Sequence, residues 1–182
     1  MRRDYARFLT AQGEPVAALE VLHAQVSERP ADAAAWQLGG EIALGRAEFL
    51  EFALDWTGEA QRALPENAAL LAQRAEALLF NGELEAALPL WRQVQGERSP
   101  GPLAAAVLCA VLTGDRQVRI GGGEEAAVSR EFVQWFRRLV ARGAEGLVRR
   151  LQQQLGELGQ VLPGAAGVLG GVLAQVEQPV AA

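Results

Sequence analysis

The chain has 182 residues, of which 50% are hydrophobic, and a formal net charge of −5. A chain of this size and composition can bury a core, which argues against extensive disorder. The acidic balance argues against nonspecific nucleic-acid binding, which requires excess cations to displace counterions from phosphates. No segment reaches the roughly 18 apolar residues of a membrane-spanning helix, and no apolar stretch follows the N-terminal arginines. We therefore expect a cytoplasmic location.

Charge is distributed unevenly along the chain. Residues 1–115 carry nine arginines against sixteen carboxylates, whereas residues 116–182 carry eight arginines against six carboxylates. Such an asymmetry suggests two different regions. Together with the run Gly121–Gly123, it predicts three parts: helical repeats over 1–115, a glycine-rich linker over 116–123 and a helical tail over 124–182.

The N-terminal segment has the pattern of a helical hairpin. Apolar residues over 5–9 predict a first helix, Gly13 interrupts it, and a second apolar stripe over 16–26 ends before Pro30. Proline closes such a unit because it cannot continue a helix and disfavours helical geometry in the residue before it.

The same unit recurs twice, at a period of about 35 residues. The second copy has a first helix around Trp36 and a second helix over 50–60, closed by Pro65, and the third copy runs over 71–94. A fourth first helix is predicted over 103–112, and no partner helix can be recognised directly after it.

This pattern resembles the tetratricopeptide repeat (TPR), a helical hairpin of about 34 residues. In the second copy the aromatic Trp36 is followed four positions later by Gly40, and then by Ala53, Ala60 and Pro65, as in the family signature. We interpret Gly40 as the point where the two helices of one hairpin cross closely. The resemblance implies stacked hairpins whose first helices line a concave face.

The copies depart from the family pattern in several places. Arg2 stands at the aromatic position of the first copy and Leu71 at that of the third, and Gly45–Ala47 lengthens the second turn by about one residue relative to the family. The repeats are therefore degenerate. The sequence predicts an all-α fold, a TPR-like α-solenoid of about three helical hairpins plus one further helix, followed by a C-terminal helical region.

The resemblance implies a protein-interaction scaffold with a protein or peptide as its partner. Its groove would be cationic at one end and acidic and apolar further along, which suits an extended peptide or a helix better than a small molecule. The residues that the resemblance places on the concave face are Arg3, Arg7 and Thr10 from the first copy, Gln37, Glu41 and Leu44 from the second, and Ala72, Glu76, Leu79 and Phe80 from the third.

The tail begins with a basic amphipathic helix. Ser129 is its expected N-cap or first-turn residue, and Gly143 is its expected end. Phe132, Trp135 and Phe136 fall on one side of this helix and arginines occupy the rest, a pattern that can serve a membrane surface or a partner groove. Because aromatic stripes at helical spacing more often belong to a core, we expect packing against the chain's own last repeat.

Further along the tail, apolar residues over 148–176 alternate at spacings of three and four, as in a helix–helix seam. Pro163-Gly164 interrupts the pattern, so we predict two helices, over 144–161 and 165–177, instead of one continuous coiled coil. A homodimer through this seam is one possible use of it.

Two alternatives to an open scaffold remain. The tail helices could occupy the groove, with Phe132, Trp135 and Phe136 over its apolar end, to give a closed structural unit. The tail also resembles segments that follow TPR arrays in some bacterial proteins associated with glycosyltransferases, through Val128–Trp135 and Val161–Pro163. That resemblance implies at most an accessory role, because no transferase catalytic domain is recognisable.

Catalytic residue types are scarce in this sequence. His23 is the only histidine and Cys109 the only cysteine, so no Ser-His-Asp, Cys-His or multi-thiolate metal site can be built. Carboxylate pairs such as Glu48 and Glu51 lie at helix starts, where negative charge is stabilising. We therefore expect no enzyme activity, no cofactor and no metal, and we expect Cys109 to be a small core residue.

Overall fold

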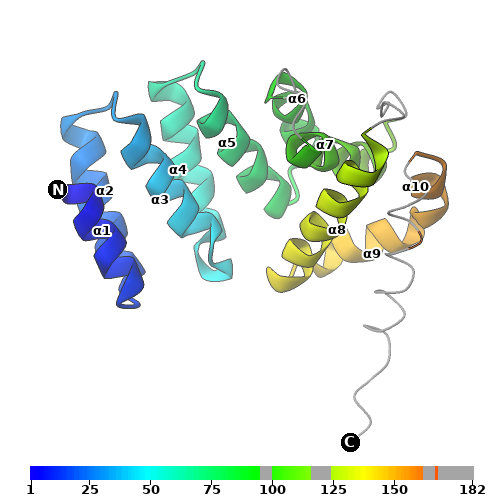
Figure 1. Cartoon of the computed structure of the whole chain (residues 1–182), viewed down its shortest axis with the longest axis horizontal. Helices are drawn as coiled ribbons and strands as arrows, with labels where there is room; N and C mark the ends of the chain where they lie inside the picture. Colours follow the sequence, from blue (N-terminus) through cyan, green and yellow to red (C-terminus); the bar gives the residue numbers. More distant parts are fainter. Residues whose placement is uncertain (95–99, 116–123, 162–166, 168–182) are drawn as a thin grey trace, which may run out of the picture. The chain divides into compact units, whose positions relative to one another are not determined.

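The computed structural model describes residues 1–94, 100–115, 124–161 and 167, and in these ranges its regular elements are helical (Figure 1). The elements are α1 (Arg2–Ala11), α2 (Pro15–Glu28), α3 (Ala33–Leu44), the 3-10 turn η1 (Ala47–Phe49), α4 (Leu50–Ala63), α5 (Ala68–Phe80), α6 (Leu84–Val94), α7 (Pro100–Thr113), α8 (Glu125–Ala141), α9 (Glu145–Gln153) and α10 (Leu155–Val161). The predicted first and second helices of all three hairpins, and the fourth first helix, are confirmed.

The chain forms two compact units, Met1–Leu90 and Trp91–Ala182. In the first unit, α1 packs against α2, α2 against α3, α3 against α4 and α4 against α5, so successive hairpins lie side by side (Figure 1). The expected linker over 116–123 lies outside the described residues, and the three-part division of the sequence stays a prediction.

Side-chain caps define where the first helices of the second and third hairpins begin. The Asp32 carboxylate accepts a hydrogen bond from the Ala35 N–H (3.1 Å), and the Asn67 side chain accepts one from the Leu70 N–H (3.1 Å). Each bond satisfies an N–H group that the first turn of a helix leaves without a partner. The hairpins therefore begin at Asp32 and Asn67, two residues after the prolines Pro30 and Pro65.

The first helices of the first and third hairpins end in the same glycine turn. Gly13 and Gly82 both have φ of 80°, a left-handed conformation that costs glycine no steric penalty. The N–H that follows each glycine bonds back across the turn, from Glu14 to the Leu9 carbonyl and from Glu83 to the Leu78 carbonyl, both at 2.9 Å. This is the Schellman arrangement, which satisfies the last carbonyls of a helix.

The second unit repeats this glycine turn twice. Gly114 (φ 74°) ends α7 and Gly143 (φ 69°) ends α8, and the N–H groups of Asp115 and Ala144 bond back to carbonyls five residues earlier. The expected end of the tail's first helix at Gly143 is confirmed. Thr113-Gly114-Asp115 also forms the same turn as the end of α5, as the sequence indicated.

The end of α3 is different. Gly45 keeps a right-handed conformation (φ −65°), Arg46 is extended, and η1 follows before α4 begins. The extra residue of this turn, visible in the sequence, is therefore accommodated by a short 3-10 segment instead of a left-handed glycine.

Two tryptophans form the centre of the second hairpin. The rings of Trp36 and Trp56 lie edge to face at a centroid separation of 4.9 Å, and the Trp56 N–H donates to the Trp36 carbonyl (2.9 Å). A Cβ atom at Gly39 would overlap the Trp56 ring, with the indole nitrogen at only 2.8 Å. Gly39, and not Gly40, therefore allows the two helices of this hairpin to approach.

Gly40 serves a different contact from the one that the sequence suggested. A Cβ atom there would meet the side chain of Gln73 on α5, whose Cδ would lie at 2.7 Å. Gln73 extends across this glycine and donates to the Gln37 carbonyl (2.9 Å). Gly40 thus allows the first helices of neighbouring hairpins to meet, and our interpretation of it as the crossing point within one hairpin is wrong.

The second unit is built on α7, where every residue from Ala104 to Leu112 is buried, including Cys109. α8 packs against α7, and α9 packs against both. The Trp135 N–H donates to the Gly101 carbonyl (3.1 Å), and the Trp135 ring lies edge to face with Trp91 at 5.4 Å. The hydrophobic side of α8 is therefore part of a core.

Two expectations for the tail need correction. α8 begins at Glu125 with Glu124 as its N-cap residue, so Ser129 lies within the helix and does not cap it. The single helix expected over 144–161 is divided at Gln154 into α9 and α10. The second helix expected over 165–177 lies outside the described residues.

No helix in the described part of the chain combines the length and apolar character needed to cross a membrane.

Candidate functional site

The predicted binding residues occupy equivalent positions on consecutive first helices. Glu41 and Glu76 each lie nine residues after the capping residue of their helix, and Arg7 and Glu76 each lie six residues before the left-handed glycine that ends theirs. Arg7, Glu41 and Glu76 therefore form one row, and Arg3, Gln37 and Ala72, one turn earlier, form another. We call these two rows the first-helix face.

Side chains of the first-helix face reach from one hairpin to the next. The Arg3 guanidinium lies 3.6 Å from the carboxylate of Asp32, the N-cap residue of α3. Gln73, adjacent to Ala72 on α5, bonds to the Gln37 carbonyl of α3. The first contact joins α1 to the start of α3, and the second joins α5 to α3, so the first-helix face runs across these three neighbouring helices.

The charged residues of the face differ in accessibility. Arg7 is exposed, and its one ion pair with a described residue is with Asp4 of its own helix, at 3.4 Å. Glu41 is exposed and has no ion-pair partner within the described residues. Glu76 and Gln37 are half-buried, and Glu76 takes part in further interactions. Arg7 and Glu41 are therefore the charges most available to a ligand.

The apolar part of the predicted groove is packed inside the protein. Leu44, Leu79 and Phe80 are only 4%, 0% and 6% exposed. Thr10 donates to the carbonyl of Ala6 in its own helix (2.9 Å). A role of these four residues in binding stays a prediction, and the exposed members of the predicted set are Arg7 and Glu41.

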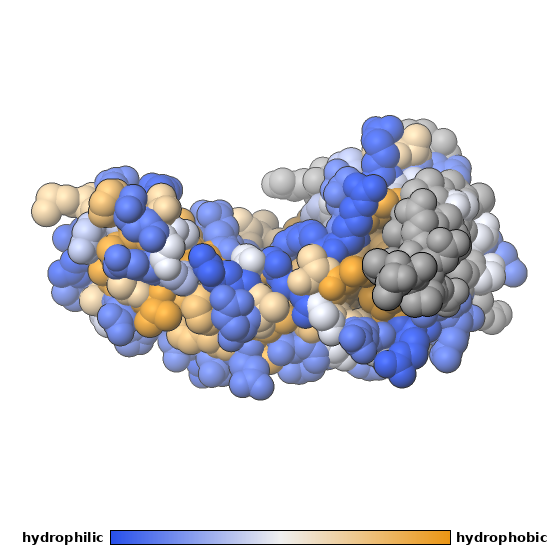
Figure 2. Space-filling model, turned by 90° about the horizontal axis from the view of Figure 1, so that it is seen from below, coloured by the Kyte–Doolittle hydropathy of each residue, from blue (hydrophilic) through white to orange (hydrophobic). Residues whose placement is uncertain are grey.

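Exposed apolar side chains occur instead at the start of the chain. Tyr5, Phe8 and Val16 are each more than half exposed, whereas Ala6 and Leu9 supply the buried side of α1. Viewed from the end where the α1–α2 and α3–α4 turns lie, the first unit shows apolar residues interspersed among polar ones (Figure 2). The apolar stripe expected over 5–9 is therefore only partly a core stripe.

A charged pocket of about 360 Å³ lies where α1 begins and α2 ends, lined by Met1, Arg2, Arg3, Gln25, Glu28, Arg29 and Asp32. The Arg2–Glu28 ion pair (2.7 Å) crosses it. Hydrogen bonds from Gln25, and secondarily from the Ala35 N–H, lower the pKa of Asp32 below its ordinary value of 3.8. The charges of this pocket are largely paired with one another.

In the second unit, the predicted interface residues Phe132, Trp135 and Phe136 are all buried. The Arg138 guanidinium stacks over the Trp135 ring at 4.4 Å from its centroid, and burial lowers the pKa of Arg138. The segment Val128–Trp135, which carries the resemblance to glycosyltransferase-associated tails, thus supplies much of the buried side of α8.

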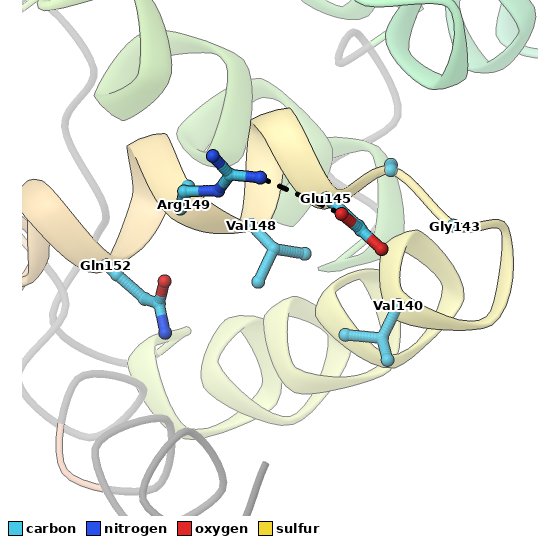
Figure 3. A pocket seen from close by; sticks show the side chains of 7 residues that line it. Val140, Gly143, Glu145, Val148, Arg149 and Gln152 are labelled. Atoms are coloured by element: carbon cyan, nitrogen blue, oxygen red, sulfur yellow. Dashed lines mark ion pairs between the residues drawn. The ribbon is translucent and has the colours of Figure 1, made fainter. Parts of the chain in front are cut away.

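The turn between α8 and α9 forms a second pocket that the sequence did not indicate. It has a volume of about 340 Å³ and is lined by Val140, Gly143, Ala144, Glu145, Val148, Arg149 and Gln152 (Figure 3). Val140 and Val148 project into it from facing helices, and the Glu145–Arg149 ion pair (3.7 Å) lies along one side. Val148 was recognisable as a seam position, but the approach of Val140 depends on the turn at Gly143.

The chain has one histidine and one cysteine. His23 is exposed. Within the described ranges, no three histidine, cysteine, aspartate or glutamate residues are grouped so that they could hold a metal ion. Those predicted binding residues that are exposed in the structure, Arg7 and Glu41, are charged.

Comparison with known proteins gives a structural match only. No family model matches the sequence, and no curated protein matches it. The solved structure of YrrB, described as a TPR protein with an unusual peptide-binding site, is similar to this chain with a TM-score of 0.55 and 17% sequence identity. The match covers 89% of this chain and 85% of that one. The fold is thus a TPR-like all-α solenoid, as the sequence predicted.

Proposed function

We propose that this chain is a protein-interaction scaffold that binds a peptide or a partner helix on the first-helix face. The observation that carries the proposal is that α1 and α3 each bury their apolar residues and expose a charged residue. Their apolar residues Leu9, Trp36 and Ile42 are buried, whereas Arg7 and Glu41, at equivalent positions, remain exposed. Repetition of an accessible position along stacked hairpins creates an extended surface that suits an extended ligand.

The chemistry of this surface suits a polypeptide. Arginine and carboxylate side chains recognise charged side chains, and the amide of Gln37 can bond to a peptide backbone. A net charge of −5 disfavours a nucleic-acid partner. YrrB, which shares the fold, is described as having a peptide-binding site, and this supports the same class of ligand here.

Selection of peptides from a random displayed library tests the proposal. We expect the protein to enrich peptides whose binding is weakened by the double substitution Glu41→Arg and Glu76→Arg. The control pair Glu20→Arg and Glu59→Arg makes the same change in net charge on α2 and α4 and should leave binding unchanged. If the enriched peptides bind the Glu41→Arg/Glu76→Arg protein as tightly as the unmodified one, the binding surface lies elsewhere.

A homodimer through the tail seam is a second candidate, favoured by the exposed Val140 and the half-buried Val148 of the α8–α9 pocket. Leu151 and Leu158, which the seam would also use, are already buried within one chain. Light scattering across a concentration series measures the oligomeric state. A dimer that Val148→Glu converts to a monomer would support this candidate, and a monomer at every concentration would exclude it.

A further inference from the structure

We propose that the first-helix face selects an extended peptide carrying one acidic and one basic residue three positions apart, the acidic residue pairing with Arg7 and the basic residue with Glu41. This inference rests on the proposed function, because it specifies the ligand of the same surface. The ligand is a dipolar peptide, that is, one whose acidic and basic residues are opposite in charge to Arg7 and Glu41.

The first step is the equivalence of the two charges. Arg7 matches Glu76 in its distance from the glycine that ends the helix, and Glu41 matches Glu76 in its distance from the N-cap, so Arg7 and Glu41 occupy the same position on consecutive first helices. The contact from Arg3, one turn before Arg7, to the N-cap residue of α3 shows that this side of α1 faces α3. A ligand chain crossing from α1 to α3 therefore meets a positive charge and then a negative one.

The second step is the availability of both charges. Among the described residues, Arg7 forms an ion pair with Asp4 alone, three residues away on an exposed surface, and a pair of this type contributes little stability. Glu41 is exposed and makes no ion pair within the described part of the chain. By contrast, Arg2 is held at 2.7 Å by Glu28. Binding through Arg7 and Glu41 therefore disrupts no buried interaction.

The third step is the spacing. Packed helices lie about 8–10 Å apart, and α1 is in contact with α3. An extended chain of the polyproline II type advances about 3.1 Å per residue with three residues per turn, so side chains three positions apart lie about 9 Å apart on the same side of the peptide. Since an extended peptide can lie in either direction, acid-x-x-base and base-x-x-acid sequences both satisfy the geometry.

The test is a change of specificity by charge reversal. A displayed library of random peptides of about nine residues, long enough to cross three helices, is selected separately on the unmodified protein, on Glu41→Arg and on Arg7→Glu. We expect enrichment of opposite charges three positions apart on the unmodified protein, of two acidic residues on Glu41→Arg and of two basic residues on Arg7→Glu. Glu20→Arg, an exposed residue of α2, is the control for net charge and should retain the original preference.

Affinities of individual enriched peptides provide the quantitative readout. Because exposed ion pairs are weak, each reversal should raise the Kd of the original peptides by about three- to tenfold, and the difference should shrink as ionic strength rises from about 0.05 to 0.3 M. Far-UV circular dichroism checks that each variant is folded.

The outcomes separate this inference from the proposed function. Peptides that bind, but whose charge pattern and spacing are the same for all four proteins, overturn the dipolar motif and leave the scaffold in place. If the unmodified protein enriches no peptide above the background of the empty support, both proposals are overturned.

Discussion

Replacing Gly39 by alanine should destabilise the first unit, although alanine is normally the better helix former. The new methyl group would overlap the Trp56 ring, which is itself fixed by its hydrogen bond to the Trp36 carbonyl. Overpacking costs about 1–3 kcal/mol, here about 2–3 kcal/mol because three Trp56 ring atoms would lie within 2.8 Å of the new carbon, and the gain in helix propensity offsets about 1 kcal/mol. The expected net loss is about 1–2 kcal/mol in the free energy of unfolding.

Gly58 on α4 is a matched control. The nearest atom to a Cβ there is the Arg74 guanidinium nitrogen at 3.5 Å, an ordinary contact. Gly58→Ala should therefore stabilise the protein by up to about 1 kcal/mol through helix propensity alone. Urea denaturation followed by circular dichroism measures both variants under the same conditions.

A double-mutant cycle identifies the cause of the loss. Trp56→Leu destabilises the protein in its own right, but it also makes room beside Gly39, so Gly39→Ala should cost less in that background than in the unmodified protein. If Gly39→Ala stabilises the protein as much as Gly58→Ala does, or costs the same with and without the Trp56 ring, the close approach at Gly39 is not the determinant of this hairpin.

Three further predictions concern helix ends. Gly82→Ala should cost about 1 kcal/mol or more by urea denaturation because of the left-handed backbone, and Gly82→Asn should cost less because asparagine tolerates that conformation; equal costs would contradict the account of the turn. Asp32→Ala should remove about 1 kcal/mol at pH 7 by loss of the cap. Because the folded-state pKa of Asp32 is depressed, its contribution is present above pH 4 and is lost as the pH falls through the lowered pKa, so the variant should lose less stability on acidification than the unmodified protein. Arg150→Met should destabilise the second unit by about 1 kcal/mol, since Arg150 donates to the Leu112 carbonyl near the end of α7; Arg149→Met, which removes only an exposed pair, is the control and should cost under about 0.5 kcal/mol.

The hairpins could be predicted from sequence because their signals are local. Apolar spacing indicates each helix, and Pro30 and Pro65 stand two residues before the next hairpin begins. Gly13 and Gly82 end their helices because glycine adopts the left-handed conformation of the turn. The longer turn after α3 was visible for the same reason. None of these features depends on a distant part of the chain.

The errors concern features that depend on packing. The different roles of Gly39 and Gly40 cannot be assigned from spacing, because the direction of the Trp56 and Gln73 side chains decides which glycine each of them meets. The burial of Leu44 and Leu79 likewise depends on which helices pack around them. Ser129 has the right residue type for a cap, but the helix simply begins one turn earlier.

The candidate site, like the fold, was only partly predictable from the sequence. The row of Arg7, Glu41 and Glu76 follows from the repeat period, and in the structure Arg7 and Glu41 are exposed whereas Glu76 is half-buried. The pocket between α8 and α9 was not predictable, since it depends on how the turn at Gly143 brings Val140 towards Val148. Residue type and repeat period are therefore enough to predict a repeated surface, whereas a single pocket can be located only when the three-dimensional structure is known.

The four tryptophans are divided evenly, with Trp36 against Trp56 in the first unit and Trp91 against Trp135 in the second. Indole rings at such short separations couple electronically, so each pair gives its unit a near-ultraviolet dichroic signal and a fluorescence of its own. Substituting phenylalanine for one member of a pair removes the dichroic contribution that arises from coupling within that pair and leaves the other pair intact. The protein thus carries an intrinsic optical probe for each unit, with which the order of their unfolding can be followed without an attached dye.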